Sequence, residues 1–178
     1  MTADVERDMQ GAREGSSLPS RVVVLGIGNT LMGDEGVGVH AVQTLLQRYD
    51  LAEQVAVIDG GTAGMELLPE LENIDHLIVI DAVRCGQPPA SVARMAGEQV
   101  PAFFKTKLSP HQVGLSDVLA ALRFKGTAPG SIVLIGVQPK CMELGMELSP
   151  EVQTSLERVL TLVVGELAEA GQQARLRG

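Results

Sequence analysis

The sequence has few cysteines and very few aromatic residues. Its 178 residues include two cysteines, Cys85 and Cys141, no tryptophan, one tyrosine and three phenylalanines. Two cysteines are too few for a disulfide framework or a thiolate zinc site, so we expect a reducing compartment, the cytoplasm. With so few aromatic rings, a stacking platform for nucleic-acid bases is not expected. The core must be aliphatic, and a chain of this length is expected to form one domain.

Clustered positive charge and long apolar runs are also lacking. The 14 Lys and Arg residues against 22 Asp and Glu residues give a formal net charge of −8. Nucleic acids and anionic membranes recruit clustered basic residues, so neither is an expected partner. No apolar stretch approaches the roughly 20 residues that cross a bilayer. Residues 1–20 lack the apolar run of a signal peptide, and we interpret them as a disordered arm.

Short β-branched apolar runs alternate with longer segments of helical spacing from residue 21 onward, which is typical of an α/β fold. We expect helices on both faces of a five-stranded, mostly parallel sheet. A proline-rich stretch after residue 81 is too short for a crossover helix, so the strand at 91–95 is predicted to be antiparallel. Residues 171–178 are interpreted as a polar tail. The predicted strands are 22–25, 55–59, 76–81, 91–95 and 131–137, and the predicted helices are 36–49, 65–73, 110–124 and 150–170.

Acidic residues follow three of the predicted parallel strands. Asp34 and Glu35 come after the first, Asp59 ends the second and Asp81 ends the third. Ligands of open α/β sheets bind beyond the carboxyl ends of the strands. We therefore expect these carboxylates along one edge of the sheet. His111, at the start of a predicted helix, joins them if the preceding loop folds over that edge.

A dinucleotide site is the first function to consider, because Gly26 and Gly28 follow a strand and precede a helix. The fingerprint fails, since Leu31 occupies the third glycine position and the next acidic strand end is too distant. The sequence also has no Gly-x-Ser-x-Gly elbow or His-Glu-x-x-His helix, so standard serine hydrolase and zincin mechanisms have no support.

A divalent metal site is the second possibility, because two carboxylates and an imidazole suit nickel, zinc or a similar ion. Each residue also has a structural explanation. Asp34 is explained as a helix N-cap, Glu35 by the helix dipole and Asp59 by turn chemistry. Asp81 is the strongest indication of a site, because an idle carboxylate at the end of an apolar strand is costly. His40, His76 and Cys85 are interpreted as residues without a ligand or nucleophile role.

Four sequence blocks together resemble the nickel-iron hydrogenase maturation proteases. The resemblance covers about residues 21–165 and keeps the blocks in the family's order. They are GNTLMGDEGVGVH, DGGTAGMELL, HLIVIDAV and KLSPHQVGLSDVLAALRF. It implies a twisted five-stranded sheet with one antiparallel strand, so that residues 21–170 are a single protease domain.

The resemblance also implies an activity and a site. Members of this family are endopeptidases that remove a C-terminal extension from the hydrogenase large-subunit precursor once nickel is inserted. Their metal ligands correspond to Glu35, Asp81 and His111, and Asp59 corresponds to an acid with a supporting catalytic role. Nickel is expected to be carried by the substrate, with another divalent metal able to replace it in vitro. The endopeptidase is of aspartic or metal-dependent type, and we expect a monomer.

A different class remains open at this point. The same three ligands would serve a non-catalytic nickel-binding maturation chaperone. A small nucleotide-binding domain is the weakest alternative. The phenylalanines of VPAFFKTKL, just before His111, either grip the peptide extension or belong to the core, and the core is favoured.

Overall fold

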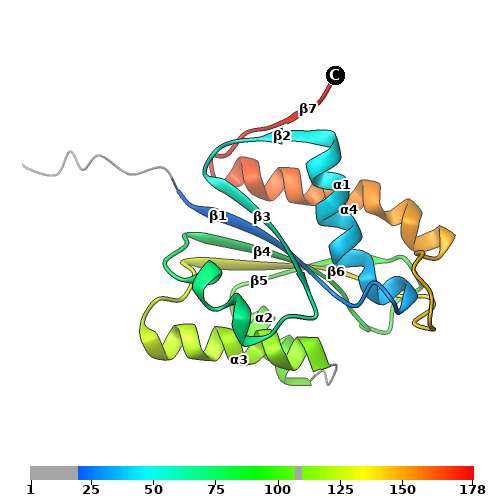
Figure 1. Ribbon diagram of the computed structural model, residues 1–178, viewed down its shortest axis with the longest axis horizontal. Coiled ribbons are helices and arrows are strands. Elements are labelled where there is room, and N and C mark those ends of the chain that lie inside the picture. The colour runs from blue at the N-terminus through cyan, green and yellow to red at the C-terminus, as the bar shows by residue number, and fades with distance from the viewer. Residues whose placement is uncertain (1–19, 107–109) are drawn as a thin grey trace, which may run out of the picture.

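A mixed five-stranded sheet forms the centre of the molecule (Figure 1). The computed structural model describes residues 20–106 and 110–178, and within these ranges it omits the side chains of 104–106 and 110–113. Of the predicted arm at residues 1–20, only Ser20 is among the described residues. The strand order is β3-β1-β4-β6-β5, in which β5 is antiparallel to β6 and the other pairs are parallel. The strands are β1 (Val22–Ile27), β3 (Val55–Gly61), β4 (His76–Ala82), β5 (Val92–Ala96) and β6 (Ser131–Val137).

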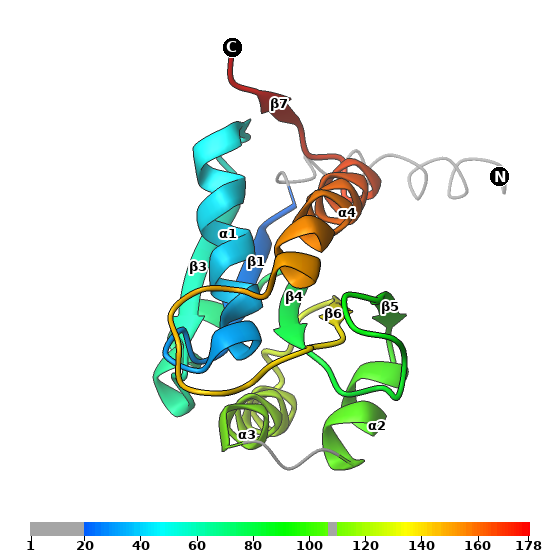
Figure 2. The ribbon, with the colours of Figure 1, turned by 90° about the vertical axis from the view of Figure 1, so that its right-hand side faces the viewer.

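Helices cover both faces of this sheet, as predicted. α1 and α4 pack on one face, and α2 and α3 lie on the other, together with two short 3-10 helices (Figures 1 and 2). The bounds are α1 (Val37–Arg48), α2 (Gln99–Thr106), α3 (Pro110–Lys125) and α4 (Pro150–Glu169). The three-layer α/β architecture with one antiparallel edge strand is confirmed. Within residues 20–106 and 110–178, no helix combines the length and apolar composition that a membrane crossing requires.

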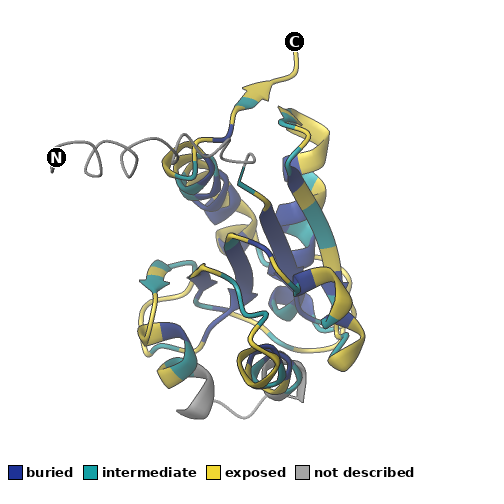
Figure 3. Ribbon diagram, turned by 90° about the vertical axis from the view of Figure 1, so that its left-hand side faces the viewer, coloured by how far each residue is buried: buried dark blue, intermediate teal, exposed yellow. Residues whose placement is uncertain are grey.

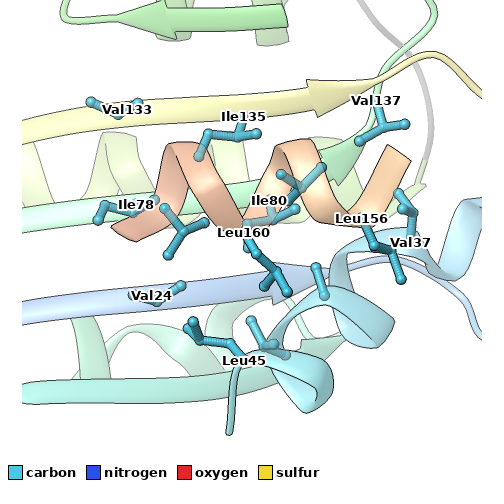
Figure 4. Close-up of a cluster of buried hydrophobic side chains, with 14 of the residues drawn as sticks. Val24, Val37, Leu45, Ile78, Ile80, Val133, Ile135, Val137, Leu156 and Leu160 are labelled. Atoms are coloured by element: carbon cyan, nitrogen blue, oxygen red, sulfur yellow. The ribbon is translucent and has the colours of Figure 1, made fainter. Parts of the chain in front are cut away.

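Each sheet face carries its own aliphatic cluster, because successive strand residues point to opposite faces. On the α1 and α4 face, Val24, Ile78 and Ile135 pack with helix residues such as Leu45 and Leu160 (Figure 4). On the α3 face, a second cluster is built from residues of alternate parity, including Leu25, Leu77, Val79, Leu115 and Leu122. The central strands are buried on both sides while the outer helix faces are exposed (Figure 3).

Two helical segments differ from the prediction. The expected helix at 65–73 is instead two 3-10 turns, η2 (Met65–Leu67) and η3 (Pro69–Leu71), because Pro69 cannot donate a backbone hydrogen bond within a longer helix. α2 was not predicted. Phe103 of α2 packs against the second cluster, which confirms the core interpretation for that residue, and the side chain of Phe104 lies outside the description.

A small second sheet was also not predicted. β2 (Tyr49–Leu51) follows α1 directly and pairs antiparallel with β7 (Ala174–Leu176) near the C-terminus. Each strand has only three residues, too few for an alternating pattern to be recognised in the sequence. The segment at 171–178 therefore carries a strand that ties the end of the chain to the end of α1.

Candidate functional site

The elements that carry the candidate residues meet at the edge where the parallel strands end, which faces the viewer in Figure 2. The chain leaves β1 into the 3-10 turn η1 (Gly33–Gly36), which leads directly into α1. The loop at 138–149, between β6 and α4, runs around this turn. The edge is thus built from η1, the ends of β3 and β4, and that loop.

Glu35 is brought to this edge by backbone packing that only glycine permits. A Cβ atom added to Gly38 would lie 2.2 Å from the carbonyl oxygen of Ile80, the residue before Asp81. A Cβ atom added to Gly28 would lie 1.8 Å from the carbonyl oxygen of Glu35. Side chains at these positions would push η1 and the start of α1 away from the sheet. The glycines therefore place Glu35, which is partly buried, within one helical turn of the contact with the end of β4.

Asp34 has a different role from the one predicted. It is fully buried and lies within η1, whereas the N-cap of α1 is Gly36. Its Oδ2 accepts hydrogen bonds from the backbone N–H groups of Lys140 and Cys141 at 2.9 and 2.8 Å, and from the Ser149 hydroxyl at 2.9 Å. Its Oδ1 accepts the Ser149 N–H at 2.7 Å. The helix-cap interpretation was wrong, because the carboxylate caps the 138–149 loop.

These hydrogen bonds also control the charge of Asp34. Burial by itself would raise its pKa, because it disfavours the ionised form. The bonds from Cys141, Ser149 and Lys140 outweigh burial and leave the pKa below its usual value. Asp34 is therefore a buried carboxylate that stays ionised and holds the loop against η1.

Asp81 is fully buried in β4 and aligns with Gly136 of β6. Strand alternation puts it on the same face as Leu77 and Val79, which is the face covered by α3. The sequence prediction of a carboxylate at the end of this strand is confirmed, and its side chain is directed to the α3 face.

Asp59 lies at the same edge but on the other face. It aligns with Gly26 of β1, and its exposed carboxylate accepts a hydrogen bond from the Gln43 amide of α1 at 3.4 Å. It also accepts the N–H of Gly61 at 3.1 Å, as the turn interpretation predicted. The expectation of one edge therefore holds for both Asp59 and Asp81, but the two carboxylates are on opposite faces of the sheet.

His111 is in the first turn of α3, and its side chain lies outside the described residues. The backbone of α3 nevertheless reaches the edge that carries the acids. A Cβ atom added to Gly114 would lie 3.1 Å from the Cα atom of Gly64, in the loop after β3. Four residues after His111, Leu115 is buried in the cluster on the α3 face. The first turn of α3 therefore lies over the sheet face that Asp81 shares.

No complete metal-binding group is present among the described side chains, which do not include His111. Within that set, no three His, Cys, Asp or Glu residues lie close enough to hold a metal ion. Carboxylate oxygens from η1 and β4 are donors of the kind that borderline divalent ions accept, and they come from elements in direct contact. Among the described side chains, the arrangement therefore offers carboxylate oxygens only.

Two of the residues interpreted as structural, His76 and Cys85, have polar neighbours in the structure. His76 lies at the opposite edge of the sheet, where its Nδ1 is 2.6 Å from the hydroxyl of Ser131. Cys85 is a free cysteine, and its Sγ lies 3.6 Å from the side-chain oxygen of Gln138. The loop at 138–149 was missed from the sequence. Its contact with Asp34 joins residues 115 positions apart, and no local pattern indicates such a contact.

Sequence comparisons with known proteins show similarity to one family. The family model described as hydrogenase maturation protease matches residues 39–166. The hydrogenase 2 maturation protease of Escherichia coli is 46% identical over 155 residues, which cover 86% of this chain and 94% of that protein. A hydrogenase expression/formation protein of Rhodobacter capsulatus is 42% identical over 155 residues, covering 86% of this chain and 74% of that protein.

The fold leads to the same family. The solved structure of the hydrogenase maturating endopeptidase HybD from Escherichia coli superimposes with a TM-score of 0.86 at 46% identity, covering 88% of this chain and 98% of that one. The chain belongs to the hydrogenase maturation protease family and is a hydrolase that acts on peptide bonds.

Proposed function

We propose that this endopeptidase removes the C-terminal extension of a nickel-iron hydrogenase large-subunit precursor after nickel has been inserted. It recognises the nickel held by that precursor through Glu35, Asp81 and His111. Water adds to the scissile carbonyl and the C–N bond breaks. The mature subunit then gains a new carboxyl terminus, and the extension leaves with a free amino group.

The observation that carries this proposal is the contact between η1 and the end of β4. Because Gly38 has no Cβ atom, the backbone of α1 can pack directly against the carbonyl of Ile80. The turn that contains Glu35 therefore lies against the strand that carries Asp81. Two carboxylates on adjacent elements, with a histidine in the first turn of the helix above, suit a divalent ion such as nickel. Another divalent ion would occupy the same donors in vitro.

Three protein ligands leave coordination positions of the nickel ion open. Such positions are required if the site is to bind a metal that the substrate already holds. Cysteines of the precursor or water fill those positions, so cleavage depends on metal delivery. In a second version of the same proposal, the ion also polarises the scissile carbonyl or activates water. Asp59 supports the reaction from the opposite face of the sheet, where its carboxylate is open to solvent. The reaction takes place in the cytoplasm, and the enzyme acts as a monomer.

The test is an electrophoretic processing assay with nickel-loaded precursor. The wild-type protein should shorten the large subunit, and Glu35→Gln, Asp81→Asn and His111→Ala should each abolish shortening while retaining the wild-type circular dichroism spectrum. If all three variants process at the wild-type rate, the ligand assignment is wrong. If the wild-type protein binds the precursor but never shortens it, the chaperone function replaces the protease function for this substrate.

A further inference from the structure

Three large apolar side chains are exposed beside the Glu35 turn. Leu31, Leu144 and Met146 are 53%, 86% and 70% exposed, and we call them the rim patch. Leu31 precedes η1, and the other two belong to the 138–149 loop. Clustered apolar side chains at the surface mark sites of interaction with another molecule, since burying them is favourable.

The rim patch is one surface, although Leu31 is more than 100 residues away from Leu144 and Met146 in the sequence. The N–H of Gly145 donates to the carbonyl of Leu31 at 2.9 Å, and the N–H of Gly33 donates to the carbonyl of Gly145 at 2.8 Å. These two bonds form a parallel bridge between Met32 and Gly145. They hold Leu144 and Met146 next to Leu31.

The loop that carries the patch is anchored on both sides of the candidate site. On one side, Asp34 accepts its four hydrogen bonds from Lys140, Cys141 and Ser149. On the other side, the guanidinium of Arg84, three residues after Asp81, lies 3.2 Å from the Met142 sulfur. A surface held in place before binding loses less entropy when a partner docks. The rim patch is thus held in place relative to Glu35 and Asp81.

We propose that the rim patch binds an extended apolar stretch near the C-terminus of the precursor and so presents the scissile bond to Glu35 and Asp81. This inference rests on the proposed function. The patch is continuous with the site, because Leu31 and Glu35 are only four residues apart. A protease of this family acts on a polypeptide, and an apolar segment of that polypeptide is the kind of ligand that exposed apolar side chains bind.

A second copy of this chain fits the patch less well. Specific protein interfaces bury at least about 1,000 Å² in total, more than three side chains supply. Exposed Glu143 and Glu147 also flank the loop segment, so pairing two copies would bring like charges together. A substrate segment does not need so large an interface at the patch, because it also makes contacts with the candidate site.

Steady-state processing of nickel-loaded precursor tests the proposal. The double variant Leu144→Ser/Met146→Ser should raise KM about tenfold or more, because two apolar side chains no longer bind. Its kcat should stay unchanged, as expected when only uniform binding is lost. The matched control is Phe124→Ser, at a side chain 95% exposed near the end of α3, which should leave both constants unchanged. An unchanged KM in the double variant overturns the proposal.

Cross-linking separates this proposal from the proposed function. Benzoylphenylalanine is placed at position 144, or at position 124 as control, and each protein is irradiated with the purified precursor. Attachment from position 144 to the C-terminal region of the precursor, with none from position 124, supports docking even if no cleavage occurs. Attachment elsewhere, or none, overturns docking. Absence of processing by the wild-type protein in the parallel assay contradicts only the protease function.

Discussion

Asp34 and Ser149 are joined by two hydrogen bonds of 2.7 and 2.9 Å across 115 positions of sequence. They connect η1, the turn that contains Glu35, to Ser149, the residue immediately before α4. Ser149 is the N-cap residue of α4 by position, but its hydroxyl makes no bond to that helix. It bonds to Asp34 instead, so one buried carboxylate links the site turn, the loop and the start of α4.

Asp34→Asn should destabilise the fold by about 3 kcal/mol. An amide group presents N–H donors where the carboxylate accepts, so at least one of the four donors loses its partner in a buried position. The ionised charge, which strengthens these bonds, is lost as well. Urea denaturation measures the effect as a lower midpoint with an unchanged slope.

Ser149→Ala is the control for Asp34, because it removes one of the four bonds and leaves the backbone bonds in place. The expected cost is about 1 kcal/mol. Equal stabilities of the Asp34→Asn variant and the wild-type protein would mean that the carboxylate does not hold the loop.

Gly38→Ala should weaken both stability and processing. The added methyl group would lie 2.2 and 2.3 Å from the carbonyl oxygens of Ile80 and Ile27, so α1 must move away from the sheet. Such overpacking costs about 1–3 kcal/mol, and it displaces Glu35 from Asp81. Thermal unfolding and the precursor assay report the two effects.

Gly165→Ala is the matched control for Gly38. Gly165 is also inside a helix, but nothing lies within 4 Å of an added Cβ atom. Alanine has the higher helix propensity, so this variant should be more stable by up to about 1 kcal/mol. A loss of stability at Gly165, or a gain at Gly38, would contradict the packing described for α1.

Asp59→Asn should lower the rate of precursor processing by at least about tenfold, equivalent to about 1.4 kcal/mol. Asparagine retains an oxygen that accepts the Gly61 N–H, so the turn and the stability should be preserved. Asp59→Ala lacks both the acceptor and the charge, so the difference between the two variants shows how much of the effect on processing comes from the turn. Wild-type processing by Asp59→Asn would restrict this residue to the turn.

The strands and the long helices could be predicted because their patterns are local. β6 was predicted with its observed bounds, and β1, β3 and β4 within two residues, since buried parallel strands are continuous β-branched runs. α2 was missed, and the helix at 65–73 was predicted where Pro69 divides two 3-10 turns. Short elements depend on packing that a local pattern does not report.

The candidate site was predictable only in part, for a similar reason. Strand ends identified Asp59 and Asp81, and topology brought them to one edge. Their opposite faces follow from register, since Asp59 aligns with Gly26 and, through it, with Ile80 rather than Asp81. Asp34 was misassigned as a helix cap because its partners lie in a loop more than 100 residues away.

Two matched precursors show whether the enzyme recognises the nickel of its substrate. Wild-type protein is incubated with nickel-loaded and with nickel-free precursor of the same purity, and the length of the large subunit is followed over time. We expect shortening of the nickel-loaded precursor alone, and cleavage of the nickel-free precursor once nickel has been inserted into it. Equal rates with both precursors would contradict it.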